Sequence, residues 1–169
     1  MLESEEGRRV LRSRPRASSY TLQLERLASF PENTFGRAHY NFYKTNGITP
    51  DSRVPVAYIE DDELAYVMQR YREVHDYMHT VCGVEVSVAS EIGLKWFEFR
   101  HTLLPMTALS VMGSAFLVKS HDLRLLPDLL RWAERTSRIS KFFLSICFED
   151  MLHLNIEQVR RYMGITPFS

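Results

Sequence analysis

The chain has 169 residues, of which 45% are hydrophobic and 25% are charged. This composition is typical of a folded globular protein and excludes a disordered or collagen-like chain. The 21 basic and 21 acidic side chains give a formal net charge of zero, which argues against a general nucleic-acid binder. The two cysteines, Cys82 and Cys147, form no CxxC pattern, so we expect a reducing compartment and no disulfide framework.

The first residues combine an acidic start with an arginine-rich run, GRRVLRSRPR, at residues 7–16. This segment has neither the apolar core of a signal peptide nor the acid-poor character of a transit peptide, so we identify no targeting segment in it. We expect residues 1–18 to form a flexible arginine-rich arm. Residues 19–169 are long enough to form a single helical domain with its own core.

Apolar periodicity predicts two helices after this arm. The first covers residues 20–29 and is stopped by Pro31, and the second covers residues 34–46 and ends at Gly47, a usual C-terminal cap residue. Residues 47–60 contain two prolines and are predicted to form a loop.

The strongest helical period in the chain lies at residues 61–82. Ser87 is a good N-cap for the next helix, which Pro105 should kink or end. The uncharged run at residues 102–118 is short for a membrane span, which takes about 20 residues, and we interpret it as a buried helix. The apolar stripe of the 61–82 helix passes through Leu64, Val67, Met68, Tyr71, Met78 and Cys82.

Two more helices complete the chain, at residues 122–135 and at residues 141–163, the second with an interruption near Asn155. No stretch alternates polar and apolar residues with a period of two. We therefore predict an all-α fold, a single-domain bundle of about six or seven helices.

Polar residues interrupt the apolar stripe of the 61–82 helix. At about 100° per residue, His75 falls within the stripe, His79 lies one turn on at its edge, and Asp76 flanks them. Two histidines four residues apart can bind one metal ion from one helix. Glu91, eleven residues after His79, can add a carboxylate oxygen. These ligand types suit a divalent metal such as zinc, iron, manganese or cobalt, and they do not choose among these metals.

Two alternatives compete with this metal site. A buried histidine is often only hydrogen-bonded to a neighbour. In addition, His39, the pair His75–Asp76 and Asp122 occur in the order that HD-domain phosphohydrolases use. That short motif leaves the second histidine and the glutamate of the helix without a role.

The sequence HDYMH at residues 75–79, followed after eleven residues by Glu91, resembles the signature of the coenzyme Q (ubiquinone) biosynthesis protein 4 family. The resemblance extends from about residue 20 to 165. The segments that carry it are DDELAYVMQRYREVHD (61–76), EIGLKWFE (91–98), LPM (104–106), RWAER (131–135) and MGI (163–165).

The resemblance implies a peripheral protein on the matrix face of the mitochondrial inner membrane. It implies a metal, usually zinc, held by His75, Asp76, His79 and Glu91. It also implies decarboxylation at C1 of a polyprenylated hydroxy- or methoxybenzoate and a role in organising the other ubiquinone-biosynthesis enzymes. A homodimer is a separate expectation that the resemblance does not supply. The alternative is a non-enzymatic scaffold that binds prenyl lipids and uses the metal structurally.

Further residues are candidates for the same chemistry. Arg72 lies about 20° from His79 around the helix and could orient an anionic substrate, although a surface salt bridge explains it equally well. Glu98, two turns after Glu91, could act beside the metal or be a solvated charge. The residues that could line a tunnel for the lipid tail, or be plain core, are Met106, Leu109, Met112 and Phe116.

Overall fold

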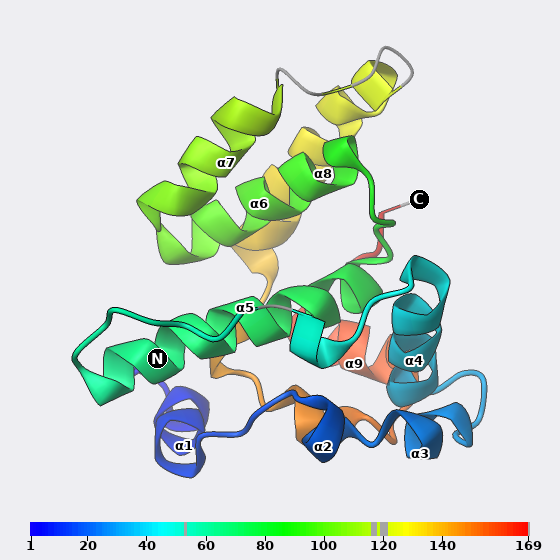
Figure 1. Cartoon of the computed structure of the whole chain (residues 1–169). Helices are drawn as coiled ribbons and strands as arrows, with labels where there is room; N and C mark the ends of the chain where they lie inside the picture. Colours follow the sequence, from blue (N-terminus) through cyan, green and yellow to red (C-terminus); the bar gives the residue numbers. More distant parts are fainter. Residues whose placement is uncertain (53, 116–117, 119–121, 169) are drawn as a thin grey trace. The chain divides into compact units, whose positions relative to one another are not determined.

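The computed structural model describes every residue except 53, 116–117, 119–121 and 169, and the side chain of residue 115. Within this part of the chain, nine α-helices and four short 3-10 helices form and no strand does, which confirms the predicted all-α fold (Figure 1). Seven of the α-helices have eight residues or more.

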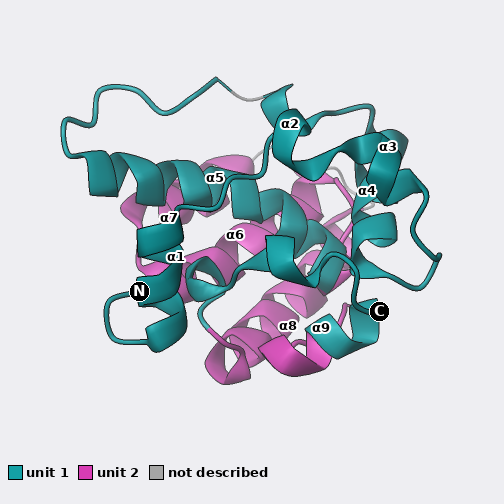
Figure 2. Cartoon of the chain, turned by 90° about the horizontal axis from the view of Figure 1, so that it is seen from below, with its two compact units in different colours: residues 1–81, 142–159 teal, residues 82–141, 160–169 magenta. Residues whose placement is uncertain are grey.

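The chain divides into two compact units (Figure 2). Unit 1 contains residues 1–81 and 142–159, and unit 2 contains residues 82–141 and 160–169. The chain therefore passes from one unit to the other near the end of its longest helix, after Lys141, and within its last helix.

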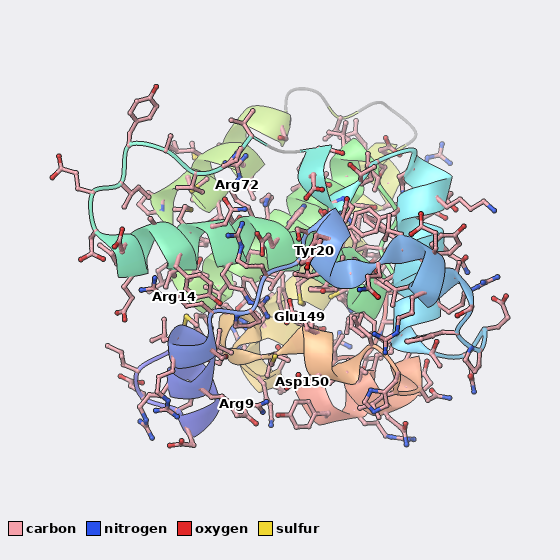
Figure 3. All side chains as sticks on the ribbon, turned by 60° about the horizontal axis from the view of Figure 1, so that its bottom comes forward. Arg9, Arg14, Tyr20, Arg72, Glu149 and Asp150 are labelled. Atoms are coloured by element: carbon pink, nitrogen blue, oxygen red, sulfur yellow. The ribbon has the colours of Figure 1, made fainter. Side chains whose placement is uncertain are left out.

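Unit 1 begins with a helix in the segment for which we expected a flexible arm. Helix α1 (Glu5–Ser13) starts at the N-cap Ser4, whose hydroxyl accepts from the Gly7 amide. Val10 is buried and packs in a small cluster with Tyr66. Arg9 of the same helix forms an ion pair of 2.6 Å with Asp150, which lies beside it in Figure 3.

The predicted helix at residues 20–29 is two short helices, α2 (Ser19–Leu22) and α3 (Leu24–Ala28). The break lies at Gln23, which has a left-handed backbone with φ of 49°. Helix α4 (Phe35–Asn46) confirms the second prediction, because Thr34 caps its start and Gly47, with φ of 62°, ends it.

A loop with one short 3-10 helix, η1 (Pro50–Ser52), leads to α5 (Asp62–Cys82), which has the predicted bounds to within one residue. Every residue from Glu73 to Cys82 is buried, so this half of the helix is covered on all sides. Its first turn differs from the predicted stripe, because 61% of Leu64 is exposed.

The prediction of a helix at residues 141–163 is wrong for its first two thirds. This segment contains two 3-10 helices, η3 (Phe143–Ser145) and η4 (Phe148–Met151), and only then α9 (Ile156–Met163). Its backbone bonds to other parts of unit 1: the Phe35 amide donates to the Leu154 carbonyl oxygen. Long-range partners of this kind replace the bonds that a helix would form.

Unit 2 is built on α6 (Val88–Thr102), which contacts both α7 (Pro105–Ala115) and α8 (Leu126–Ile139). Ser87 caps α6 as predicted, and Pro105 begins the next helix, where its missing N–H costs no hydrogen bond. A 3-10 helix, η2 (Asp122–Arg124), precedes α8, which begins and ends four residues later than predicted.

The uncharged run at residues 102–118 is not the buried helix that we expected. About two thirds of the Leu109 and Met112 side chains are exposed on α7, at 67% and 66%. Phe116 and Leu117 of this run lie outside the described residues. Among the helices of the described residues, none has the length and apolar character needed to cross a membrane.

Candidate metal centre

One face of α5 carries the polar residues singled out by the sequence. Counting about 100° per residue, Arg72, His75, Asp76 and His79 fall within an arc of about 100°. The two histidines and the aspartate are buried, with exposed fractions of 1%, 6% and 2% in chain order. Groups of this kind lose free energy in a protein interior unless they are paired or bind a cation.

The two histidines face each other through the same ring atom. His75 Nε2 and His79 Nε2 are 3.3 Å apart, and the ring planes are nearly perpendicular at 89°. Two nitrogens that bind Zn²⁺ tetrahedrally at 2.0–2.1 Å are about 3.3 Å apart. The spacing of these two nitrogen atoms therefore fits two ligands of a tetrahedral metal ion, and it also fits a hydrogen bond between the two rings.

Helix α4 positions the remaining groups of this face. The ring of Phe42 stacks on His79 with a centroid separation of 5.3 Å and an interplanar angle of 22°. The hydroxyl of Tyr43 donates to Asp76 Oδ2 at 3.3 Å. The sequence analysis did not identify either aromatic residue. Their only signal in the sequence is that they are neighbours in an aromatic-rich helix, which does not indicate a metal site.

His39, also on α4, lies beneath the same face. Its Nδ1 is 2.8 Å from the Thr80 hydroxyl, which also donates to the Asp76 carbonyl oxygen at 3.4 Å. Burial lowers the pKa of His39 from 6.5 to about 3, and the charge of His79 adds to this effect. His39 is therefore neutral, and its hydrogen bond to Thr80 fixes the backbone turn that carries Asp76.

Arg72 is partly buried and lies on α5 away from Glu149 (Figure 3).

The two cysteines, both free, offer no reactive thiolate: burial raises the pKa of Cys82, and burial raises that of Cys147 to about 11. Thiol chemistry is thus disfavoured at neutral pH, and the candidate chemistry rests with the polar face of α5.

The other candidates belong to unit 2. Glu91 lies in the first turn of α6 and is partly exposed, and its place as the fourth ligand stays a prediction. Glu98 is fully buried rather than solvated, and its Oε2 accepts from Lys95 Nζ at 2.8 Å. Met106, Leu109 and Met112 are exposed on α7 and are not plain core, and their place along a lipid tail stays a prediction.

The fold and the histidine pair define an all-α protein with a candidate metal site on its longest helix. The family model described as "Coenzyme Q (ubiquinone) biosynthesis protein Coq4" matches residues 1–169. The chain therefore belongs to this family, and that membership supports a role in coenzyme Q biosynthesis.

Relatives with curated names agree with this assignment. The mitochondrial ubiquinone biosynthesis proteins COQ4 of Laccaria bicolor and Ajellomyces dermatitidis are each 45% identical over 98% of this chain. The chain spans 56% and 58% of their lengths. A crystal structure from Nostoc punctiforme PCC 73102, of a protein whose proposed role is in ubiquinone biosynthesis, shares the fold with a TM-score of 0.77. That match has 19% identity and covers 96% of this chain and 76% of the other.

Proposed function

We propose that this chain carries out a metal-dependent step of coenzyme Q biosynthesis: removal of the ring carboxylate at C1 of a polyprenylated hydroxy- or methoxybenzoate. The observation that carries the proposal is the spacing of 3.3 Å between the Nε2 atoms of two buried histidines, His75 and His79. Family membership supports the pathway. The buried nitrogen pair supports a metal ion as the agent.

The proposed ligands are the two histidine nitrogens and one carboxylate oxygen from each of Asp76 and Glu91. This mixture of nitrogen and oxygen suits Zn²⁺, Fe, Mn or Co, and the family resemblance favours Zn²⁺ among them. When bound, the ion supplies a Lewis acid that stabilises the negative charge that develops as the carbon–carbon bond breaks. The hydroxyl of Tyr43 donates to Asp76 Oδ2 at 3.3 Å, which holds the Asp76 carboxylate in place on this face.

Arg72 and Glu98 have supporting roles in this proposal. Arg72 shares the face of His79 two turns earlier, where its guanidinium can bind a benzoate carboxylate with two hydrogen bonds. Glu98 is buried and paired with Lys95, and we assign it to orienting groups around the ligands.

The electron balance of the step has two forms. In simple decarboxylation, CO₂ leaves, the bonding electrons stay on the ring and a proton replaces the carboxylate. In oxidative decarboxylation, CO₂ leaves, a hydroxyl takes its place and the ring loses two electrons. Molecular oxygen accepts these electrons and, with one water consumed, hydrogen peroxide is released. Zinc has no redox chemistry, so with zinc the ring would reduce oxygen directly, whereas a redox-active metal in the same site could relay the electrons.

The proposed location and partners, apart from a homodimer, follow from the family resemblance. The relatives are named mitochondrial, and within the mitochondrion we propose a peripheral place on the matrix side of the inner membrane. There we expect contact with other ubiquinone-biosynthesis enzymes, with a prenylated substrate and with a second copy of the chain in a homodimer.

A non-enzymatic scaffold with a structural metal is the competing account, and the burial of both histidines favours it in one respect. A structural metal contributes folding free energy directly, whereas a catalytic one needs an open coordination position. The two accounts therefore predict different behaviour when a ligand is removed.

Turnover and stability of His79→Ala and Glu91→Ala separate these accounts. For the enzyme, both variants lose at least about a hundredfold in decarboxylation rate while they stay folded. For the scaffold, both melt at lower temperature and the metal-loaded wild type shows no turnover. His153→Ala is the control, because His153 is exposed and lies outside the proposed site. A folded, metal-loaded wild type without turnover would contradict the enzymatic account.

A further inference from the structure

A fully buried histidine, His39, lies on α4 beneath the face of α5 that carries the proposed metal ligands. The Nε2 atom of its ring has no hydrogen-bond partner among the residues that the structure describes. A buried polar atom without a partner destabilises a fold, so packing alone gives no reason for a histidine at this position. The reason lies in three neighbours of the ring, each of which also contacts a proposed ligand.

The first neighbour is a hydroxyl group on α5 that reaches the backbone of Asp76. His39 Nδ1 lies 2.8 Å from Thr80 Oγ1, and this hydroxyl also donates to the Asp76 carbonyl oxygen at 3.4 Å. A side-chain hydroxyl bound to the carbonyl four residues earlier alters the local course of a helix. His39 therefore holds the hydroxyl that acts on the turn of α5 between Asp76 and Thr80, and His79 lies in that turn.

The second neighbour is an aromatic ring that reaches the side chain of His79. The ring of Phe42 is parallel to that of His39, with an interplanar angle of 2° and a centroid separation of 6.0 Å. Phe42 also stacks on His79, at 5.3 Å and 22°. Aromatic contacts of this kind favour particular ring orientations. Phe42 thus links the orientation of the His79 ring to that of the His39 ring.

The third neighbour is the tyrosine that bonds to the Asp76 carboxylate. The rings of His39 and Tyr43 meet edge to face, with a centroid separation of 4.6 Å and an interplanar angle of 62°. The Tyr43 hydroxyl is the donor to Asp76 Oδ2. His39, Phe42 and Tyr43 are spaced by three and four residues, so they share one face of α4. All residues of this network belong to unit 1.

We propose that His39 is a positioning residue of the metal site, which orients the Asp76 carboxylate and the His79 ring through these three neighbours. The inference rests on the assignment of Asp76 and His79 as ligands in the proposed function. It extends that assignment, because groups that orient metal ligands increase the affinity of the site for its ion. Ligands that are already arranged when the ion binds offset the unfavourable burial of the His39 Nε2 atom.

The Zn²⁺ affinity of His39→Leu tests this role in the full chain. Leucine is close to histidine in size, so it keeps the core filled while it removes the hydrogen bond and the ring contacts. We expect the dissociation constant for Zn²⁺, measured by competition with a chromophoric chelator, to rise about tenfold or more. The melting temperature of the metal-free protein should change by less than about 4 °C, because the variant loses one hydrogen bond but also one unpartnered buried atom.

Thr80 separates the hydrogen-bonded route from the two ring routes. Thr80→Val keeps the shape of the side chain without its hydroxyl and should weaken Zn²⁺ binding by about threefold or more. Thr80→Ser keeps the hydroxyl and should stay within about twofold of the wild type. The double variant His39→Leu with Thr80→Val should bind Zn²⁺ about as well as His39→Leu alone, because both changes remove the same route.

The visible absorption of bound Co²⁺ gives a readout that core packing alone would not change, since its bands follow the arrangement of the ligands. His39→Leu and Thr80→Val should shift these bands, and Thr80→Ser should keep them. His101→Leu is the matched control, because His101 is another histidine whose ring packs on a phenylalanine, Phe97, at 4.5 Å. It lies about 15 Å further along α6 than Glu91 and should leave the Zn²⁺ affinity and the Co²⁺ bands unchanged.

Different results would overturn this inference and the proposed function. If the wild type binds Zn²⁺ and His39→Leu binds it within about twofold as tightly, His39 has no positioning role and the metal site stands. Equal affinities of Thr80→Val and Thr80→Ser would contradict the hydroxyl route. A metal-free His39→Leu that melts about 10 °C or more below the wild type would make His39 a packing residue. A folded wild type that binds no metal would overturn both the proposed function and this inference.

Discussion

Arg70 and Glu149 form a two-point ion pair between residues 79 positions apart in the chain. Arg70 Nη1 donates to Glu149 Oε1 at 2.5 Å, and Nη2 donates to Oε2 at 3.0 Å. Nη2 also donates to the Ile146 carbonyl oxygen at 2.8 Å. The arginine is fully buried on α5, opposite the face that carries the candidate metal ligands. This pair therefore holds the irregular segment of unit 1 against the helix that carries the histidines.

Glu149→Gln should lower the free energy of unfolding by about 3 kcal/mol, because it leaves the Arg70 charge buried without a counter-charge. Chemical denaturation monitored by circular dichroism measures this change. Asp150→Asn is the matched control, because the ion pair of Asp150 with Arg9 is exposed. This variant should lower the free energy of unfolding by less than about 0.5 kcal/mol. Equal losses of unfolding free energy in the two variants would show that the buried Arg70–Glu149 pair stabilises the fold no more than the exposed pair does.

Glu73 ties the start of the chain to α5. Its carboxylate accepts from Arg16 Nε and from the Ala17 amide, both at 2.8 Å, and from Gln69 at 2.9 Å. Glu73→Gln should increase the rate of amide hydrogen exchange at Ala17 about tenfold or more. The glutamine is a weaker acceptor, so the free energy of local opening at Ala17 falls by about 1.4 kcal/mol. Glu63→Gln, at an exposed position of the same helix, should leave that exchange unchanged. Rapid exchange at Ala17 in the wild type would instead support a flexible arm.

His39 makes stability depend on pH in a known direction. Its pKa is about 3 in the folded chain and near 6.5 when unfolded, so below pH 6.5 the unfolded chain binds a proton that the folded chain does not. The contribution of this residue is present above pH 6.5 and is lost as pH falls, by about 2 kcal/mol between pH 7 and pH 5.

His39→Gln should remove that part of the pH dependence. The comparison uses metal-free wild type and metal-free variant, so that the two proteins differ only at residue 39. Equal slopes of unfolding free energy against pH in the two proteins would show that burial does not lower the pKa of His39 in the folded chain.

Most helices could be predicted from the sequence, because their signals are local. The apolar period of α5, the Ser87 cap of α6 and the Gly47 end of α4 need only a few neighbouring residues to act. The split at Gln23 has no such signal, since only its left-handed backbone separates α2 from α3.

The segment at residues 141–155 could not be predicted, because distant residues decide its conformation. Its apolar spacing suits a helix, yet Arg70 binds the Ile146 carbonyl oxygen and the Gly36 amide binds that of Leu152. Those contacts use carbonyl groups that a helix would have used itself. Tertiary contacts therefore override the local helix propensity of this segment.

The candidate site divides in the same way. Spacing on one helix was sufficient to place His75, Asp76 and His79 on a common face. Phe42 and Tyr43 reach that face from another helix, and no pattern around them indicated a partner more than thirty residues away. The burial of Glu98 was likewise not visible in a sequence where acids are usually solvated.

Metal content tests the central claim most directly. Elemental mass spectrometry on untagged protein, purified without chelators, should find about one metal ion per folded chain, and His79→Ala should lose it while His153→Ala keeps it. Zinc in the wild type would support a Lewis-acid role, and iron or manganese would direct attention to the oxidative form. A well-folded wild type without metal, or a His79→Ala variant that retains the full amount, would contradict the assignment of His75 and His79 as metal ligands.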